Sequence, residues 1–357
     1  MIMANIYQQD GFLNYRKCEA LSSTLNVMIG PRNAGKTFGA LLHYTRCRAP
    51  FVFMRTTKAQ VELVFSEDFS PFNKLNKFEG SRYCAEKIPK SQLIGVYDDF
   101  TYEDGKKVIT GKRCGYCLAL SQIGATRGFD LDDVEVILYD EFVKHPGEVI
   151  QGSEKQFSKY ADIVFTINRD REIAGRPAIK QWLFGNSDDL SNNIICSLNL
   201  VEYIIRMKQA GENYLKLKDR DISIFLLDDS PVAKVLAEKS GLSKVFAGTE
   251  YLDMAFSNEF VYDDYSDCMP VDLHPYVPVM KYGNICIYRH KRKDGFYVRQ
   301  VKKDAVFAGI PSYQPDEKGT INAREEHAGL YYSWLAGIMI FDSYDTKLKF
   351  MKLYNIK

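Results

Sequence analysis

The segment from Gly30 to Thr37 has the residue types and spacing of a phosphate-binding loop. It is a complete GxxxxGKT (Walker A) pattern that directly follows the apolar run Leu25 to Ile29. Glycines let such a loop fold around a phosphate with its N–H groups pointing inward. A helix starting at Lys36 adds its positive end, Lys36 reaches the β/γ-phosphates and Thr37 offers a hydroxyl to Mg²⁺. An ordinary glycine-rich turn is the alternative. The predicted nucleotide-binding residues are Gly30, Pro31, Arg32, Asn33, Ala34, Gly35, Lys36, Thr37 and Phe38.

An acidic pair later in the chain can serve the same phosphate site. The run from Val134 to Tyr139 indicates a buried strand (Walker B), and it is followed by Asp140 and Glu141. Asp140 is the candidate for holding Mg²⁺, and Glu141 lies where it can polarise the attacking water. A strand that merely ends in two solvated acids is the alternative. The pair is typical of hydrolysing motors rather than of most nucleotide kinases and GTPases.

A polar residue ends the next predicted strand. Trp182 to Gly185 is an apolar run, and Asn186 follows it directly. In motor ATPases this place holds a residue that senses the γ-phosphate, and a simple Gly-Asn turn is the alternative. The NKxD motif of GTPases and the LSGGQ motif of ABC-type ATPases are both absent from the sequence.

Two short basic elements could complete a nucleotide site in trans. Arg127 lies in Gly-Ala-Thr-Arg-Gly, and Arg169 and Arg171 lie in Asn-Arg-Asp-Arg. An arginine finger neutralises the charge that develops on a transferred phosphoryl group, and it often comes from a neighbouring subunit. Each of these arginines taken alone is more typical of a surface charge. We expect at least one of them to be catalytic if the protein forms rings.

The order of apolar runs predicts an α/β domain that ends near residue 205. Short continuous runs suit strands buried on both faces of a parallel sheet, and the segments between them have helical character. A charged, largely helical stretch covers 200–242. From Pro270 the pattern changes to hairpin strands at 277–288 and 295–301, with a turn at Lys293–Gly295 and a helix near 324–336. The predicted buried runs are Leu25 to Ile29, Phe51 to Arg55, Tyr116 to Leu120, Val134 to Tyr139 and Gln181 to Gly185.

The composition is that of a globular protein with two or three domains. The chain has 357 residues, of which 46% are apolar and 26% charged, so disordered and fibrous classes are unfavoured. No run approaches the ~20 apolar residues of a membrane span, and the N-terminus lacks a signal-peptide pattern. Eight scattered cysteines indicate reduced thiols in a cytosol. Cys114 and Cys117 form the one CxxC, which we interpret as buried thiols rather than as a metal site.

The near-neutral net charge of +1 hides a segregation of charge. Residues 245–280 contain no Lys or Arg and seven acids, whereas 281–304 contain eight Lys or Arg and two Asp. Aromatic residues are interleaved with the basic ones, which favours a nucleic-acid contact over a merely solvated hairpin. The predicted nucleic-acid-binding residues are Arg289, Lys291, Arg292, Lys293 and Arg299.

The chain as a whole resembles the DNA encapsidation ATPases of small short-tailed phages, which use a packaging RNA on the portal. The resemblance rests on the two phosphate motifs, on the Asn168–Arg171 segment and on Asn186. It continues through Gly-Thr-Glu-Tyr at 248–251, Asn-Glu-Phe at 258–260 and the tail from Tyr331 to Tyr354. The phosphate motifs are generic, whereas the 248–251 segment and the tail are specific to this family.

The resemblance implies three domains. These are a P-loop ATPase domain of the additional-strand, catalytic-glutamate (ASCE) class over 1–205, a small helical linker over 206–247, and an RNase H-like α+β domain without nuclease activity over 248–357. By position, Arg127, Arg169 and Arg171 fall where the family has trans-acting basic residues. A short insertion after Phe165 shifts the register, so either Arg169 or Arg171 could be the finger.

The resemblance also implies an ATP- and Mg²⁺-dependent translocase. It would act in the host cytoplasm as a homo-oligomeric ring, a pentamer in this family, attached transiently to the portal of a procapsid together with packaging RNA. It would push double-stranded DNA inward, with no membrane partner. One alternative is a terminase-type motor whose Asp263, Asp264 and Asp267 form an active nuclease. Another is a nucleotide-gated structural clamp that hardly hydrolyses ATP.

Overall fold

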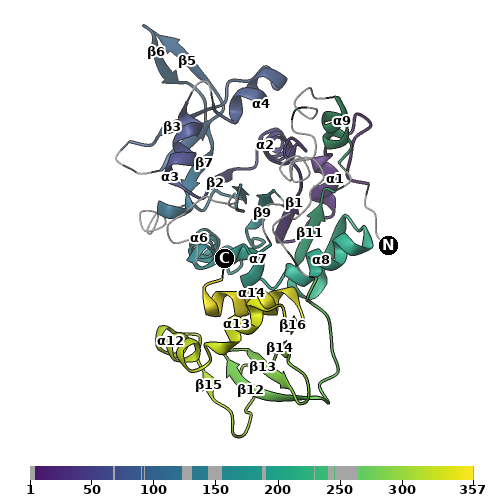
Figure 1. Cartoon of the computed structure of the whole chain (residues 1–357). Coiled ribbons are helices and arrows are strands. Elements are labelled where there is room, and N and C mark those ends of the chain that lie inside the picture. Colours follow the sequence, from purple (N-terminus) through teal and green to yellow (C-terminus); the bar gives the residue numbers. More distant parts are fainter. Residues whose placement is uncertain are drawn as a thin grey trace. The chain divides into compact units, whose positions relative to one another are not determined.

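The computed structural model describes two compact units, each with its own sheet (Figure 1). Unit 1 comprises Met1–Ser197 and Ile204–Tyr262, and unit 2 comprises Leu198–Tyr203 and Asp263–Lys357. The described residues are 5–66, 69–89, 91, 93–122, 131–143, 155–186, 190–228, 230–239, 245, 264 and 266–356. Among them, no helix is long and apolar enough to cross a membrane.

Unit 1 is built on a nine-stranded sheet in the order β10-β11-β1-β9-β8-β2-β7-β4-β3. The six strands from β11 to β7 in that order are parallel, and antiparallel strands close both edges. The strands are β1 (Leu25–Ile29), β2 (Phe51–Arg55), β3 (Cys84–Lys87), β4 (Ile94–Tyr97), β7 (Arg113–Ala119), β8 (Val136–Asp140), β9 (Lys180–Gly185), β10 (Tyr214–Leu217) and β11 (Ile222–Leu226). A separate hairpin pairs β5 (Phe100–Glu103) with β6 (Lys106–Ile109).

Helices pack against both faces of this sheet. One face carries Met28, Phe53 and Trp182 in a core shared with α1, α2 and α4. Alternate residues point to the other face, where Tyr139 of β8 stacks on Tyr160 of α6. The helices that lie wholly in unit 1 are α1 (Tyr15–Ala20), α2 (Lys36–Cys47), α3 (Lys58–Glu62), α4 (Phe72–Glu79), α6 (Gln156–Asn168), α7 (Asn193–Ser197) and α9 (Pro231–Lys239). Helix α8 (Val201–Ala210) begins in the short segment that belongs to unit 2.

The sequence located the central strands of unit 1 to within three residues. The mixed α/β class with a parallel sheet is confirmed. The expected strands at 25–29 and 51–55 coincide with β1 and β2, and β9 lies between β1 and β8. Full burial of β1 and β8 explains their continuous apolar sequence.

The described residues divide the chain differently from the expected ranges. The segment expected as a helical linker, 206–247, contains β10 and β11, and β11 pairs with β1 in the main sheet. Ile222–Leu226 is buried along its whole length and β-branched in part, so it belongs to the sheet core despite its charged flanks.

Unit 2 is an α+β unit with a five-stranded sheet in the order β15-β12-β13-β14-β16. Strands β12, β13 and β14 form an antiparallel meander, and β15 and β16 pair parallel to its outer strands. Helices α12, α13 and α14 pack on one face of it. The elements are β12 (Tyr276–Tyr282), β13 (Ile285–His290), β14 (Phe296–Gln300), β15 (Ser312–Tyr313), α12 (Glu317–Glu326), α13 (Gly329–Leu335), β16 (Met339–Phe341) and α14 (Tyr344–Tyr354).

Two local expectations in unit 2 differ from the structure. The run 277–288 is two strands, because the chain turns at Gly283, which has a φ of 56°. The helix expected at 324–336 is two helices, since the chain leaves helical hydrogen bonding between Glu326 and Gly329.

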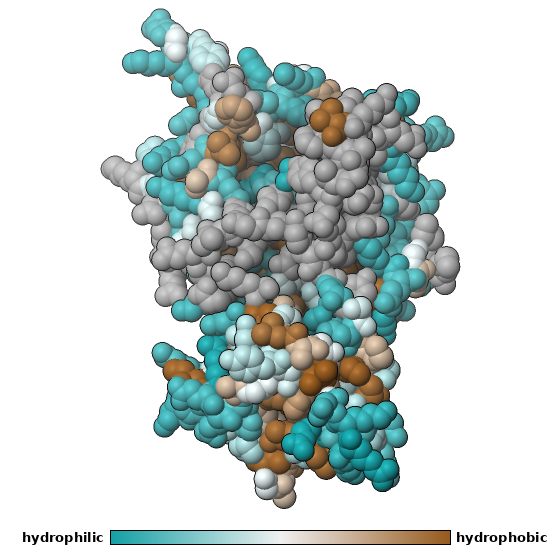
Figure 2. Space-filling model, viewed as in Figure 1, coloured by the Kyte–Doolittle hydropathy of each residue, from teal (hydrophilic) through white to brown (hydrophobic). Residues whose placement is uncertain are grey.

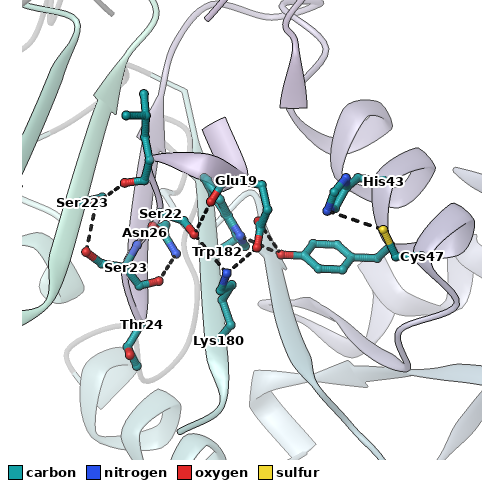
Figure 3. Close-up of polar contacts among 12 residues, drawn as sticks. Glu19, Ser22, Ser23, Thr24, Asn26, His43, Cys47, Lys180, Trp182 and Ser223 are labelled. Carbon is teal, nitrogen blue, oxygen red and sulfur yellow. Dashed lines mark hydrogen bonds and ion pairs between the residues drawn. The ribbon is translucent and has the colours of Figure 1, made fainter. Parts of the chain in front are cut away.

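A polar cluster ties α1, α2 and β9 together inside unit 1 (Figure 3). The Lys180 ammonium contacts Glu19 and donates to the Ser22 hydroxyl at 3.0 Å. The Tyr44 hydroxyl donates to Glu19 at 2.9 Å and accepts from the Trp182 indole at 2.9 Å. Because burial and the adjacent Glu19 both raise the pKa of Tyr44, its hydroxyl stays protonated as a donor.

We predict that Lys180→Met lowers the free energy of unfolding by about 1–3 kcal/mol, because Glu19 loses its cation while partly buried. Urea denaturation followed by Trp182 fluorescence, in a Trp334→Phe background, measures this change. The control is Lys216→Met, which removes an exposed lysine bonded to the Ser22 carbonyl and should shift stability by under about 0.5 kcal/mol. Equal losses in the two variants would show that the ion pair adds nothing.

Candidate functional site

The GxxxxGKT segment forms a tight loop between the carboxyl end of β1 and the start of α2. The Gly30 N–H donates to the Gly185 carbonyl at 3.2 Å, and a Cβ on Gly30 would lie 2.5 Å from Leu227. Gly35 has a φ of 90°, a backbone conformation that favours glycine. The loop therefore requires glycine at both positions. Gly30 allows close packing, and Gly35 allows the backbone conformation.

Lys36 lies at the first position of α2 and is 8% exposed. Its ammonium donates to the Gly30 carbonyl at 2.6 Å, the Pro31 carbonyl at 2.8 Å and Asn186 Oδ1 at 3.2 Å. The site thus holds a positive charge inside the loop. Asn186, which the sequence analysis selected as a candidate γ-phosphate sensor, lies at the carboxyl end of β9 within hydrogen-bonding distance of this ammonium.

Thr37 and Asp140, the two residues predicted to hold a metal, are hydrogen-bonded to each other. The Thr37 hydroxyl donates to Asp140 Oδ1 at 2.8 Å, although the two residues belong to α2 and β8. Burial raises the pKa of Asp140, while Arg55 and the Thr37 hydrogen bond act in the opposite direction. A hydroxyl and a carboxylate are hard oxygen donors of the kind that Mg²⁺ prefers, so these residues fit a magnesium ion.

Glu141 follows β8 in the left-handed region, with a φ of 53°. Its side chain is 44% exposed, whereas that of Asp140 is 6% exposed. This difference suits the two expected roles, since an ion-holding acid can be buried but an acid that orients water must reach solvent.

Arg55 pairs with both of these acids, and the sequence prediction missed it. Its Nη2 lies 2.8 Å from Asp140 Oδ2, and its Nη1 contacts Glu141 Oε2. The signal was available, because Arg55 is the one charged residue of the otherwise apolar β2. The contact of Arg55 with the two acids follows from β2 lying beside β8, and the sequence analysis did not predict this strand order.

A cavity of about 580 Å³ joins these groups and is lined by Lys36, Thr37, Asp140, Glu141 and Asn186. It contains most of the predicted nucleotide-binding residues. Six further lining residues, which the sequence prediction did not select, come from the N-terminal segment and from α4: Gln8, Asp10, Phe12, Leu13, Lys74 and Phe78. The Lys74 ammonium lies 5.3 Å from the centre of the Phe38 ring, so α4 adds both charge and aromatic surface.

The two arginines of the 168–171 segment have different environments. Arg171 is 5% exposed, and its guanidinium donates to the Val134 carbonyl at 2.6 Å and the Pro177 carbonyl at 3.2 Å. Arg169 is exposed at the end of α6. Both lie near the amino ends of β8 and β9, away from the Asp140 edge, and Arg127 lies outside the described residues.

The predicted nucleic-acid residues do not share one face of unit 2. Lys291, Arg292 and Lys293 form the exposed turn between β13 and β14, where His290 Nδ1 accepts the N–H groups of Arg292 and Lys293 at 3.1 and 3.0 Å. Arg289 and Arg299 are exposed on the strands, and strand alternation directs them to opposite faces of the sheet. The visible surface of this unit has both strongly hydrophilic and apolar areas (Figure 2).

The acids considered for a nuclease site are bound to a lysine. Lys347 Nζ lies 2.7 Å from Asp267 Oδ1 and 3.7 Å from Asp264 Oδ2, and its side chain is 6% exposed. Asp263 lies outside the described residues. An ammonium therefore lies between two carboxylates where a two-metal site would need a cation. Among the described residues, no group of three or more His, Cys, Asp or Glu is arranged to hold a metal ion.

The CxxC cysteines are free thiols of β7. Cys117 is buried, Cys114 is half-buried, and the Cys114 thiol donates to the Val96 carbonyl at 3.5 Å. Burial raises the pKa of Cys114 to about 12, so this thiol stays protonated near neutral pH.

The fold is similar to that of two solved phage motor proteins. The Phi-28 gp11 DNA packaging motor matches with a TM-score of 0.63 at 14% identity, over 98% of this chain and 99% of that one. The bacteriophage Phi-29 viral genome packaging motor assembly matches with a TM-score of 0.60 at 15% identity, over 97% and 99%. The sequence matches no protein-family model and no curated protein sequence. These similarities show a fold shared over nearly the whole chain.

We predict that Arg171→Ala lowers the free energy of unfolding by about 1–3 kcal/mol, because two backbone carbonyls lose a charged donor. Arg169→Ala, whose side chain is exposed, should change it by under about 0.5 kcal/mol. Urea denaturation of the two variants gives the comparison. A stable Arg171→Ala protein would contradict the buried structural role that we assign to this arginine.

Proposed function

We propose that this chain is an ATPase that drives double-stranded DNA into a viral procapsid. The observation that carries the proposal is the convergence of Lys36, Thr37, Asp140, Glu141 and Asn186 on one cavity at the carboxyl edge of a parallel sheet. These residues come from separate segments of the chain, and together they supply the phosphate-binding, metal-binding and water-orienting groups of an ATP-hydrolysing site. The similarity in fold to two phage packaging motors supports the coupling to DNA.

Each residue has a role that follows from its position. The Lys36 ammonium, held by neutral acceptors, is available to the β/γ-phosphate oxygens, and Asn186 beside it can detect the γ-phosphate. Thr37 and Asp140 would hold Mg²⁺, which when bound neutralises charge on the phosphates. Glu141 orients the attacking water and accepts its proton.

The ion pair with Arg55 restricts when the Glu141 carboxylate can orient the attacking water. One oxygen of the Glu141 carboxylate, Oε2, is held by the guanidinium. Release of Glu141 from Arg55 would free this oxygen to contact the attacking water.

The remaining parts of the proposal concern assembly and partners. We propose a homo-oligomeric ring, a pentamer as in the resembled family, on the portal with packaging RNA in the host cytoplasm. Arg169 is then the better candidate for the arginine finger that acts on a neighbouring subunit. It is exposed and lies away from the nucleotide cavity of its own chain, whereas Arg171 is buried. We also propose that unit 2 is an RNase H-like domain without nuclease activity, which the Lys347 pairing with Asp264 and Asp267 supports.

We predict that Glu141→Gln lowers the rate of ATP hydrolysis by at least about 100-fold while ATP affinity is retained, because only the water-orienting acid is lost. Phosphate release with DNA present measures the rate, and a fluorescent ATP analogue measures the affinity. Glu135→Gln is the matched control, since it alters an acid just before the other end of β8.

An unchanged rate in Glu141→Gln would contradict the proposed mechanism. Tight ATP binding with no turnover in the unaltered protein would indicate the nucleotide-gated clamp instead. Mg²⁺-dependent DNA cleavage that is lost in Asp267→Ala would indicate the terminase-type nuclease.

The turn between β13 and β14 gives a second prediction. Arg292→Glu with Lys293→Glu should weaken DNA binding and flatten its dependence on salt by about two units of log–log slope, because two phosphate contacts are lost. Affinity measured across a series of salt concentrations gives the slope. The control Lys318→Glu with Lys352→Glu changes the same charge at exposed positions elsewhere in unit 2. A slope like that of the unaltered protein would exclude the turn from the interface.

A further inference from the structure

Two buried side-chain amides bind the backbone carbonyl of Phe142, the residue that follows Glu141. Gln156 Nε2 donates to the Phe142 carbonyl at 2.6 Å, and Asn192 Nδ2 donates to the same oxygen at 3.1 Å. Gln156 is 6% exposed and Asn192 is 7% exposed. The two donors come from the first residue of α6 and from the residue before α7, far from Glu141 in the sequence.

The amides hold a backbone that would otherwise relax. Glu141 has a φ of 53°, which costs free energy for a residue with a Cβ. Such conformations persist where the surroundings fix the chain on both sides. Before Glu141, Asp140 is paired with Phe184 in the sheet, and after it the Phe142 N–H donates to the Phe184 carbonyl at 3.3 Å. The two amides bind the carbonyl of the same residue, Phe142.

The orientation of both amides is fixed by their other partners. Gln156 Nε2 also donates to the Tyr139 hydroxyl at 2.9 Å, and Gln156 Oε1 accepts from Asn192 Nδ2 at 3.1 Å. Asn192 Oδ1 accepts the N–H groups of Ile194 and Ile195 at the start of α7. Turning either amide over would set oxygen against oxygen, so the donors are held toward Phe142.

The same hydrogen-bond network extends to the residue beside Arg55, the arginine that pairs with Glu141. The Tyr139 hydroxyl lies 3.0 Å from the Thr56 hydroxyl, and Thr56 directly follows Arg55. All four side chains of this network, Thr56, Tyr139, Gln156 and Asn192, are buried. The network therefore fixes both the backbone that carries Glu141 and the end of β2 that carries its arginine.

We propose that Gln156 and Asn192 are positioning residues for Glu141, acting as a clamp on the Phe142 carbonyl. They do not line the nucleotide cavity, and they act by keeping the Glu141 carboxylate aimed into it. The inference rests on the proposed function, because it assumes that Glu141 orients the attacking water. Neither residue stands out in the sequence, since a lone Gln and a lone Asn carry no motif.

The test uses two variants, each of which removes one donor to the Phe142 carbonyl. Gln156→Met has a similar volume and no amide, and Asn192→Asp retains the oxygen that caps α7 but loses the donor to Phe142. We expect kcat to fall by about ten- to a hundredfold in each, because small displacements of a catalytic group have costs of this size. The affinity for a fluorescent ATP analogue should stay within about twofold, since the phosphate loop is untouched.

Tyr160→Phe is the matched control. Tyr160 lies on the same helix, is also buried and donates to Gln181, and a phenylalanine there keeps the ring that stacks on Tyr139. Its kcat should equal that of the unaltered protein even if its melting temperature falls. If Gln156→Met does not fold, Asn192→Asp carries the test, because it keeps the α7 cap.

The possible outcomes separate this inference from the proposed function. Full kcat in both clamp variants, together with a large loss in Glu141→Gln, would overturn the clamp and leave the ATPase proposal standing. A parallel loss of ATP affinity and kcat would also overturn it, because that result indicates general damage to the site. Full activity of Glu141→Gln would instead contradict the proposed function itself.

Discussion

The parallel alignment of β1, β9, β8 and β2 is the constraint on which the rest of the structure depends. Parallel strands bring their carboxyl ends to one edge of the sheet, and at this edge the chain places Lys36, Asn186, Glu141 and Arg55. With β9 between β1 and β8, Asn186 lies between the phosphate loop and the acidic pair. One topological fact thus assembles a site from residues that are far apart in sequence.

Balanced charge allows so many ionisable groups to share this edge. Lys36 and Asp140 are both under a tenth exposed, and an unpaired buried charge is strongly destabilising. Arg55 bridges Asp140 and Glu141, and Lys36 is bonded by three oxygen acceptors. The protein alone can therefore keep the site folded. A bound nucleotide with its metal would exchange partners within the site rather than create it.

The sequence predicted many of the strands of unit 1 correctly, and it predicted those of unit 2 less well. Strands buried on both faces leave a continuous apolar run that is easy to recognise, as in β1 and β2. Strand β11 is as long as β1 and was missed because charged segments flank its buried residues. In unit 2, one sheet face packs against helices and the other against loops. Its strands therefore lack a single pattern, and the turn at Gly283 was hidden inside one expected strand.

The sequence by itself predicted roles for Lys36 and Thr37, because a phosphate-binding loop has particular residue types at fixed spacings along one stretch of chain. It predicted roles for Asp140 and Glu141 because they end a continuous apolar run. Only the tertiary structure decided that Arg55 faces the acids, that Arg171 is a buried structural residue, and that Gln156 and Asn192 hold the Phe142 carbonyl. These contacts join strands and helices whose adjacency is set by sheet order and packing. A single arginine, glutamine or asparagine carries no spacing rule that could reveal its partner.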